Sequence, residues 1–380
     1  MKTYIYPLIY AIAMAATIYY NGLNHPIAKI VSMAAFGSLL LFSFINRVKT
    51  KGKNKIFSSC FVWYILACVI NFVYGTMKGI EYNNIEFYFN LEIALPLIVA
   101  YSSYYLFDIK REKLSIYMLP ICLFAAYCSI SSVLSGLGGF VVSEYYDDEI
   151  AKNQVGIAFA SIAIICAVFA LESKRIIRVT YAILSVICLY PVIFFACRTA
   201  LISYGVVVAF LLYRDYKWKG IIVAPLLLGI IVLLGGDSLN DILYSSIVGR
   251  KDVNDFDDLT SGRVTHATLS LEYFLRNPLV GFYGSSDGFN HMPPNAHIYL
   301  LYRLTKWGII GAIPFIALYW SLLKVFIRSV KKQDLLIAGL LCLAFIASFS
   351  EFAPPFGPGS SFIIMYILIG YYLRQETLKV

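Results

Sequence analysis

Three polar side chains lie where long apolar stretches of the sequence begin or end. Arg198 lies between two apolar stretches, Arg263 follows a Ser-Gly pair, and His297 lies where a long polar interval becomes apolar again. The planar guanidinium of arginine can hold a phosphate through two parallel hydrogen bonds. An imidazole can accept a proton from a hydroxyl group near neutral pH. These residue types predict a site that binds a phosphorylated ligand and activates a hydroxyl group.

Each of the three residues also has a structural interpretation. Arg198 can extend its side chain to lipid headgroups from the edge of a membrane helix. Arg263 can be a solvated loop residue, although we expect it at the start of a helix, where the dipole favours anions. His297 can be a hydrogen-bonded structural residue. We favour the functional interpretation for all three, and we expect His297 to be the base.

Three further side chains are candidates for substrate binding. Arg276 ends the helix predicted after Arg263, because a proline follows two residues later. Tyr299, Arg303 and Lys306 recur at helical spacing, which predicts one polar, cationic face on the next helix. We therefore add Arg276, Arg303 and Tyr299 to the predicted binding residues. Arg276 can equally be a solvated charge at a helix end.

A metal site is the alternative that the polar interval leaves open. The segment 255–258 contains an Asp-x-Asp pattern, and such paired carboxylates can hold a divalent ion beside a diphosphate. The three histidines His266, His291 and His297 have a spacing that matches no metal motif. Asp-x-Asp is common in acidic loops, so we expect neither a metal nor a cofactor.

The elements that position these residues are apolar. The chain has 380 residues, of which 60% are hydrophobic and only 14% are charged. A soluble domain carries about 25% charged residues. Apolar runs of about 15–20 residues recur along the chain, and each can cross a bilayer as a helix. The composition predicts an all-α polytopic membrane protein.

Twelve membrane spans account for these runs. They cover residues 4–20, 27–45, 56–76, 91–107, 114–134, 155–171, 179–196, 200–213, 220–235, 307–326, 335–350 and 360–373. The chain thus divides into nine spans within 1–236, a polar loop at 237–299, and three spans within 300–380. We expect the loop to carry short helices and much of the site.

The basic residues indicate the orientation. Of the 31 Lys and Arg residues, 21 fall in alternate loops and near the termini, whereas 16 of the 22 acidic residues fall on the opposite side. Basic loops face the cytoplasm, so both termini are predicted there and the polar loop outside. The net charge of +9 is therefore explained by the membrane orientation, which argues against nucleic acid as a partner.

All eight cysteines lie in or beside apolar runs, so we expect no disulfide.

The C-terminal half resembles the bacterial O-antigen ligase/polymerase superfamily. The resemblance rests on CRTAL at 197–201, SGR at 261–263, RNPLVGFYG at 276–284 and NAHIYLLYRLTKWGIIGAI at 295–313, together with KNQVG at 152–156. Three features depart from the family pattern. Cys197 stands where serine is usual, Asn295 precedes His297 instead of following it, and the interval from Gly281 to Gly284 is one residue longer.

The resemblance implies an activity and a location. Members resemble GT-C-type glycosyltransferases and use a glycan linked to undecaprenyl pyrophosphate, in the bacterial inner membrane. An acceptor hydroxyl attacks the anomeric carbon on the periplasmic side with inversion, and the lipid pyrophosphate leaves. The resemblance implies that Arg198 and Arg263 bind the pyrophosphate in place of a metal, and that His297 activates the acceptor.

The sequence leaves three functions open. An O-antigen polymerase uses a second lipid-linked repeat unit as acceptor, whereas an O-antigen ligase uses lipid A-core; we favour the polymerase. A flippase or other transporter predicts ionisable residues at mid-membrane and broken helices. The candidate residues gather at one interface instead. A chain-length regulator and a flippase of the same pathway are expected as partners of a polymerase.

Overall fold

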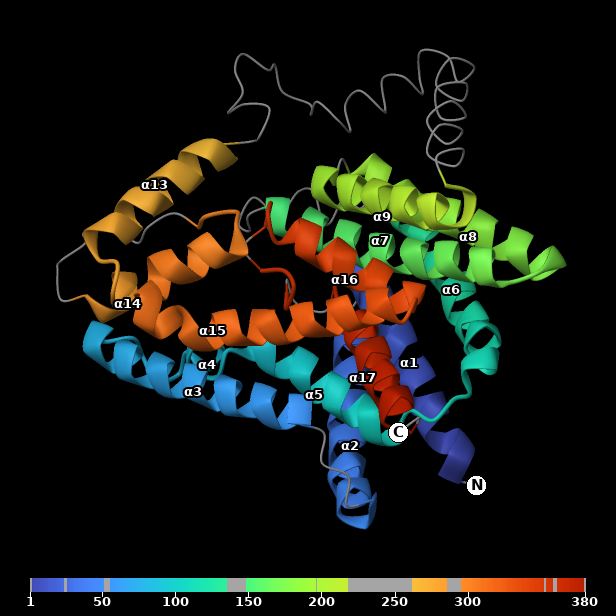
Figure 1. Ribbon diagram of the computed structural model, residues 1–380, viewed down its shortest axis with the longest axis horizontal. Helices are drawn as coiled ribbons and strands as arrows, with labels where there is room; N and C mark the ends of the chain where they lie inside the picture. The colour runs from blue at the N-terminus through green and yellow to red at the C-terminus, as the bar shows by residue number, and fades with distance from the viewer. Residues whose placement is uncertain are drawn as a thin grey trace.

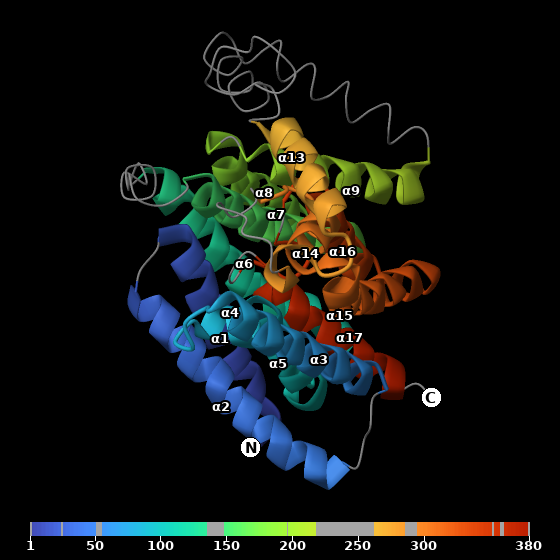
Figure 2. The ribbon, with the colours of Figure 1, turned by 90° about the vertical axis from the view of Figure 1, so that its left-hand side faces the viewer.

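The computed structural model describes residues 2–23, 26–50, 55–134, 148–195, 197–217, 262–285, 295–351, 353–357 and 361–378. Every regular element in these ranges is an α-helix. Figure 1 shows the helices packed against one another at several angles, and Figure 2 shows α1 and α2 on one side of this bundle. The predicted all-α class is thereby confirmed for the described part of the chain.

The predicted apolar segments, apart from 220–235, overlap described helices, and several of these helices extend beyond the predicted bounds. In chain order they are α1 (Lys2–Leu23), α2 (Pro26–Thr50), α3 (Lys55–Lys78), α4 (Ile85–Phe89), α5 (Leu91–Leu106), α6 (Arg111–Leu134), α7 (Asp148–Glu172), α8 (Arg175–Phe194), α9 (Arg198–Tyr216), α13 (Arg263–Arg276), α14 (Gly281–Gly284), α15 (Tyr299–Lys331), α16 (Leu335–Ala347) and α17 (Ile363–Leu378). The predicted ninth span, 220–235, and most of the loop at 237–299 lie outside the described residues.

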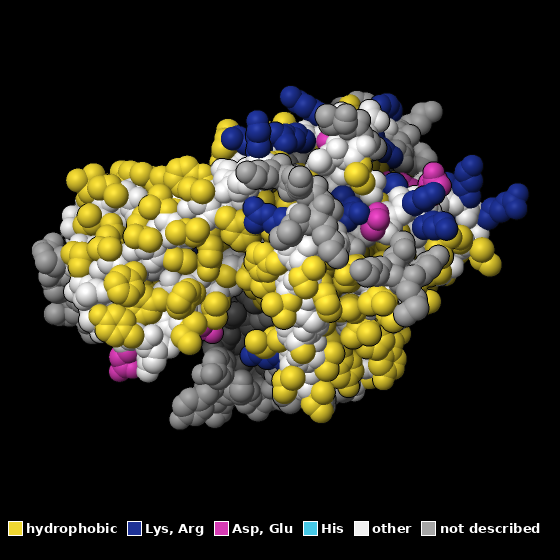
Figure 3. Space-filling model, turned by 90° about the horizontal axis from the view of Figure 1, so that it is seen from below, with side chains coloured by type: hydrophobic (Ala, Val, Ile, Leu, Met, Phe, Trp, Pro, Cys, Tyr) yellow, Lys and Arg dark blue, Asp and Glu magenta, His cyan; other side chains and the backbone are white. Residues whose placement is uncertain are grey.

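Within the described residues, six helices are long and apolar enough to cross a bilayer, namely α2, α3, α6, α7, α8 and α15. The helices α5 and α16 are apolar but shorter. Large hydrophobic side chains point outward, such as Leu41 at 67%, Val62 at 63% and Val186 at 69% exposure. Viewed from below, hydrophobic side chains cover large parts of the visible face, and many Lys and Arg side chains gather toward one side (Figure 3). These features agree with a multi-pass membrane protein.

The centre of the bundle is formed by helices that are apolar on all sides. Every residue of α17 from Ile363 to Leu373 is buried, as expected for a helix without a polar face. It lies directly on α5, because a Cβ atom on Gly370 would come within 2.1 Å of the Ala100 carbonyl oxygen. Ser103 of α5 donates a hydrogen bond to the Ile367 carbonyl oxygen at 2.6 Å.

Ion pairs occur at two levels of the bundle. At one level Arg111 contacts Glu172 at 3.0 Å, and Arg374 contacts Asp108 at 3.1 Å. At the other level Arg263 contacts Glu351 at 2.7 Å, and the Glu351 carboxylate also accepts a hydrogen bond from Asn153. Both Asn153 and Glu172 belong to α7, and their 19-residue separation corresponds to about 28 Å of helix. This length is close to the roughly 30 Å thickness of a bilayer hydrocarbon core.

The helix α15 is broken at Gly308, where φ is 66° and ψ is −177°. The NPLVG segment, residues 277–281, leads into α14 and accepts hydrogen bonds from the backbone that follows this break. The N–H groups of Ile309 and Ile310 donate to the carbonyl oxygens of Pro278 and Leu279, at 2.8 and 3.0 Å. The second half of α15 therefore begins with backbone N–H groups that the chain itself satisfies, as a helix N-terminus requires.

Candidate functional site

The carboxylate of Glu351 is the centre of a polar cluster. Glu351 follows the turn 348–350 that ends α16, and only 7% of the residue is exposed. The Ser348 carbonyl oxygen in this turn accepts a hydrogen bond from the Tyr299 N–H at 2.9 Å. This bond fixes the start of α15 against the end of α16. It therefore holds His297, two residues earlier, beside Glu351.

Arg263 reaches the cluster from the start of α13. The preceding Gly262 has φ 76°, a left-handed conformation that glycine adopts without steric cost. Arg263 Nη2 lies 2.7 Å from Glu351 Oε1, and only 20% of the Arg263 side chain is exposed. Among the described residues, Nε of Arg263 has no hydrogen-bond acceptor. The guanidinium therefore keeps donor capacity after its contact with Glu351.

Two more donors share the same carboxylate oxygen. Asn153 Nδ2 donates to Glu351 Oε1 at 2.9 Å, and Thr199 Oγ1 lies 3.5 Å from it. Arg198 is the first residue of α9, next to Thr199, and is half-buried. The N-terminal ends of α7 and α9 can meet here because Gly156 has no side chain: a Cβ atom on it would lie 2.4 Å from that of Cys197. The predicted segments 152–156 and 197–201 are thus in contact.

His297 lies on the other side of the carboxylate. Its Nδ1 atom is 3.6 Å from Glu351 Oε2, within ion-pair range but longer than a hydrogen bond. The His266 ring stacks on the His297 ring, with centroids 5.6 Å apart and planes 15° from parallel. His266 comes from the first turn of α13, three residues after Arg263. The structure therefore brings together His297, Arg263 and the N-terminal end of α9.

Arg303 and Tyr299 belong to a second, buried cluster. Arg303 Nη2 lies 3.0 Å from Glu92 Oε2, and only 2% of Arg303 is exposed. Its guanidinium carbon lies 4.7–5.1 Å from the ring centroids of Tyr299, Tyr302, Trp307 and Phe315. The predicted cationic face of this helix therefore points into the protein. Both cation–π contacts and the ion pair hold Arg303 in place.

Arg276 lies far from the cluster. It is exposed at the last residue of α13, with its guanidinium carbon 5.6 Å from the Tyr273 ring centroid. Thirteen residues of helix separate it from Arg263, which corresponds to about 20 Å. The structure therefore does not bring Arg276 together with Arg263 and His297.

Two sequence candidates lie outside the described residues. They are His291 and the Asp-x-Asp segment 255–258. Within the described ranges, no group of three or more His, Cys, Asp and Glu side chains is arranged to hold a metal ion.

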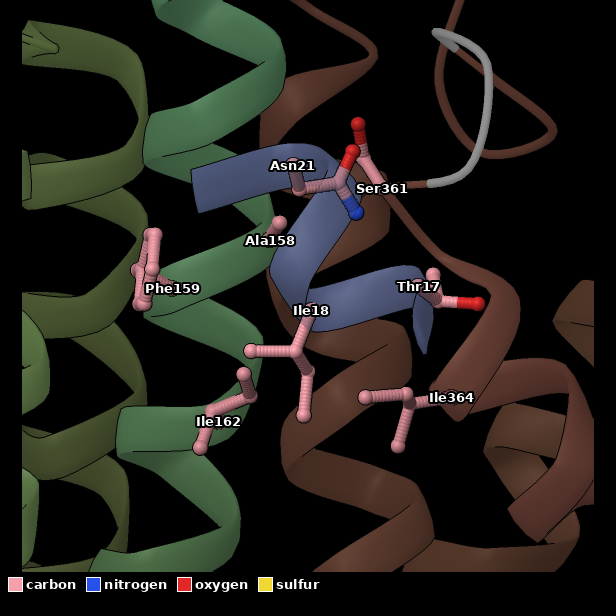
Figure 4. A pocket seen from close by; sticks show the side chains of 8 residues that line it. All are labelled: Thr17, Ile18, Asn21, Ala158, Phe159, Ile162, Ser361 and Ile364. Carbon is pink, nitrogen blue, oxygen red and sulfur yellow. The ribbon is translucent and has the colours of Figure 1, made fainter. Parts of the chain in front are cut away.

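A small pocket lies between α1, α7 and α17 (Figure 4). Asn21 and Ser361 lie at one end of it, and Ile18, Ile162 and Ile364 lie at the other. Asn21 also accepts a hydrogen bond from Gln154, the neighbour of Asn153, at 3.4 Å. None of the described residues lining this pocket is titratable. The described lining of this pocket therefore adds no acid or base to the Glu351 cluster.

Sequence reasoning missed Glu351 and undervalued His266. A signal for Glu351 was present, because it is the only charged residue between Asp334 and Arg374. Arg198 is isolated in the same way between Arg178 and Arg214. An isolated charge between apolar spans predicts function, because its desolvation is costly.

Comparison with known proteins adds no family assignment: no protein-family model matches this sequence, and no curated protein matches it.

Proposed function

We propose that this protein is an O-antigen polymerase, an inverting glycosyltransferase of the bacterial inner membrane. It would transfer a glycan from undecaprenyl pyrophosphate to a hydroxyl group of another lipid-linked repeat unit. One observation carries the proposal: Arg263 and His297 converge on Glu351, beside the N-terminal end of α9 and Arg198. This cluster combines cations for a pyrophosphate with a base for a hydroxyl.

The arginines act on the leaving group. When the acceptor oxygen attacks the anomeric carbon, the bond from that carbon to the pyrophosphate oxygen breaks and its electron pair leaves with the pyrophosphate. This leaving group needs no proton, but its charge must be stabilised. Preorganised guanidinium groups provide such stabilisation at low cost in reorganisation. Arg198 and Arg263 take this role.

His297 acts on the acceptor. Its imidazole accepts the hydroxyl proton as the new glycosidic bond forms. The side chain is 13% exposed and lies just before the start of α15. The proton then passes to solvent on the outer side of the membrane, where the distribution of charges predicts this cluster to lie.

Among the described residues, the broken helix α15 is a feature that favours a transporter. Discontinuous membrane helices often bind ions or substrates through the N–H groups freed at the break. Here the N–H groups of Ile309 and Ile310 already donate to Pro278 and Leu279. The break therefore has a structural role, and it carries no transport proposal.

Loss of the gene tests the proposal and separates polymerase from ligase. A polymerase deletion is expected to leave lipopolysaccharide with a single repeat unit attached to its core. Complete absence of O-antigen from the core would identify a ligase instead. Unchanged long chains would contradict both activities. Electrophoresis of extracted lipopolysaccharide measures each outcome, and expression of the wild-type chain in the deletion strain is the control.

Removal of divalent ions is expected to leave the transfer activity intact, because the arginines replace the metal. Purified protein would be assayed with a lipid-pyrophosphate-linked glycan in the presence and absence of EDTA. Loss of activity that a divalent ion restores would contradict the arginine mechanism and favour the Asp-x-Asp segment 255–258.

A further inference from the structure

We infer that Glu351 is a positioning residue that sets the tautomer and orientation of the His297 imidazole. The inference rests on the proposed function and adds a residue to it. Glu351 contacts neither the acceptor nor the donor in this role. It acts through His297 on one side and holds Arg263 on the other.

The two carboxylate oxygens have different partners. Oε1 is shared by Arg263 at 2.7 Å, Asn153 at 2.9 Å and Thr199 at 3.5 Å. Oε2 faces Nδ1 of His297 at 3.6 Å. Since donors from three separate elements already occupy Oε1, Oε2 is the oxygen that can accept a proton-bearing nitrogen of the imidazole.

This arrangement selects one histidine tautomer. A carboxylate beside Nδ1 favours the form with the proton on Nδ1, which leaves the lone pair of Nε2 to accept a proton. Hydrogen bonds of this kind are often long without substrate and shorten in the reacting complex. The 3.6 Å separation is therefore suited to a contact that tightens when the acceptor binds.

The ring has limited freedom to turn away from Glu351. His266 stacks almost parallel on His297, at 15° between ring planes, and covers one face of the imidazole. His266 and Arg263 belong to the same turn of α13. The contact of Arg263 with Glu351 thus also fixes the ring that covers His297.

Glu351 is not itself the base in this arrangement. Protonation of Oε1 would disrupt the hydrogen bonds from Arg263 and Asn153, and Oε2 faces Nδ1 of His297. During the reaction the hydroxyl proton moves to Nε2 of His297, the acceptor oxygen bonds to the anomeric carbon, and the pyrophosphate leaves with its electron pair. Glu351 keeps its charge throughout, and that charge stabilises the imidazolium that forms.

Glu351→Gln tests this role sharply. Arg263 and Asn153 would hold the amide oxygen of the glutamine, so the amide NH2 would face His297 Nδ1. The NH2 group donates to Nδ1 and forces the proton onto Nε2, which blocks the base. We expect kcat to fall roughly 10²–10⁴-fold, with little change in KM for the lipid-linked donor. Glu351→Asp keeps the carboxylate and is expected to recover part of the activity.

Glu172→Gln is the matched control. Glu172 also pairs with an arginine, Arg111 at 3.0 Å, but at the opposite end of α7. The kcat of the Glu172→Gln variant is expected to stay near that of the wild type. In a His297→Ala background, Glu351→Gln is expected to cause almost no further loss, because a positioning residue acts only through its partner. Full activity of Glu351→Gln, or a loss confined to donor KM, would overturn the inference.

A spectroscopic readout separates this inference from the proposed function. The protein has four histidines, so labelling with [15N]histidine gives few imidazole signals, and His297→Gln identifies those of His297. We expect the wild-type signals to show the Nδ1-protonated tautomer and Glu351→Gln to shift them toward the Nε2-protonated form. Unchanged signals would refute the positioning role whatever the activity. A tautomer shift in a protein without transferase activity would refute the proposed function alone.

Discussion

Arg263→Ala is expected to lower glycan transfer at least about 100-fold, because one fixed cation at the leaving pyrophosphate is lost. The expected loss is in kcat, since the charge develops on the leaving group in the transition state. Arg198→Ala is expected to have a similar effect. Arg263→Lys should recover only part of the activity, because lysine retains the charge but lacks the planar fork that binds two oxygens. Initial rates with purified protein and a lipid-pyrophosphate donor measure these effects.

The control for Arg263→Ala is Arg178→Ala. Arg178 is exposed on the first turn of α8, and its Nε donates to the Ser173 carbonyl oxygen at 3.0 Å. This variant should retain full activity. Arg263→Ala leaves Asn153 and Thr199 as donors to Glu351, so the protein is expected to fold and reach the membrane. A folded Arg263→Ala protein with normal activity would contradict the role of Arg263 in binding pyrophosphate.

Gly281→Ala and Gly308→Ala are each expected to destabilise the protein by about 3 kcal/mol or more, from left-handed backbone strain combined with overpacking. Gly281 and Gly308 have φ values of 65° and 66°. A Cβ atom on Gly281 would lie 2.2 Å from the Gly308 nitrogen, and one on Gly308 would lie 2.4 Å from the Gly281 nitrogen. Neither backbone can move without losing the hydrogen bonds that close the break in α15.

Thermal unfolding in detergent measures this destabilisation, and Gly205→Ala provides the control. Gly205 is exposed on α9, and a Cβ atom on it would have no neighbour within 4 Å among the described residues. The melting temperature of the Gly205→Ala variant should therefore stay close to that of the wild type. Equal melting temperatures for Gly281→Ala, Gly308→Ala and Gly205→Ala would show that the two backbones do not approach so closely. This test does not depend on the proposed activity.

The sequence predicted the helices well because membrane helices follow a simple physical rule. A segment that crosses hydrocarbon must be apolar and must satisfy its own backbone hydrogen bonds, so its length and composition are visible in the sequence. The predicted segments 91–107 and 114–134 correspond to α5 and α6 within three residues at each end. The predicted helical start before residue 307 is also confirmed, because α15 begins at Tyr299.

The sequence could not predict how the polar residues pair. The spacing of Tyr299 and Arg303 correctly placed them on one helix face, but periodicity does not tell whether a polar face points outward or inward. Glu92, which pairs with Arg303, lies 211 residues earlier in the chain. Glu351 likewise meets Arg263 only through the packing of α13, α15 and α16. Such contacts depend on tertiary arrangement and leave no local pattern.

The break in α15 was also hidden from sequence reasoning. Glycine is common in membrane helices, so Gly308 within an apolar run predicted a continuous helix. Only the approach of Gly281 shows why the backbone must leave the helical conformation there. The RNPLVGFYG segment therefore has a structural role in the described chain, in addition to any role of Arg276.

The length of α7 between its two ends has an evolutionary consequence. Asn153 and Glu172 anchor the same helix at both polar levels, and the residues between them are apolar apart from Gln154 and Ser161. Exchange of one apolar residue for another of similar volume preserves both anchors. A single inserted or deleted residue instead rotates one anchor by about 100° and moves it about 1.5 Å along the axis. Divergence in this helix should therefore proceed by substitution. The number of residues between Asn153 and Glu172 sets the distance from the site to the opposite end of the helix.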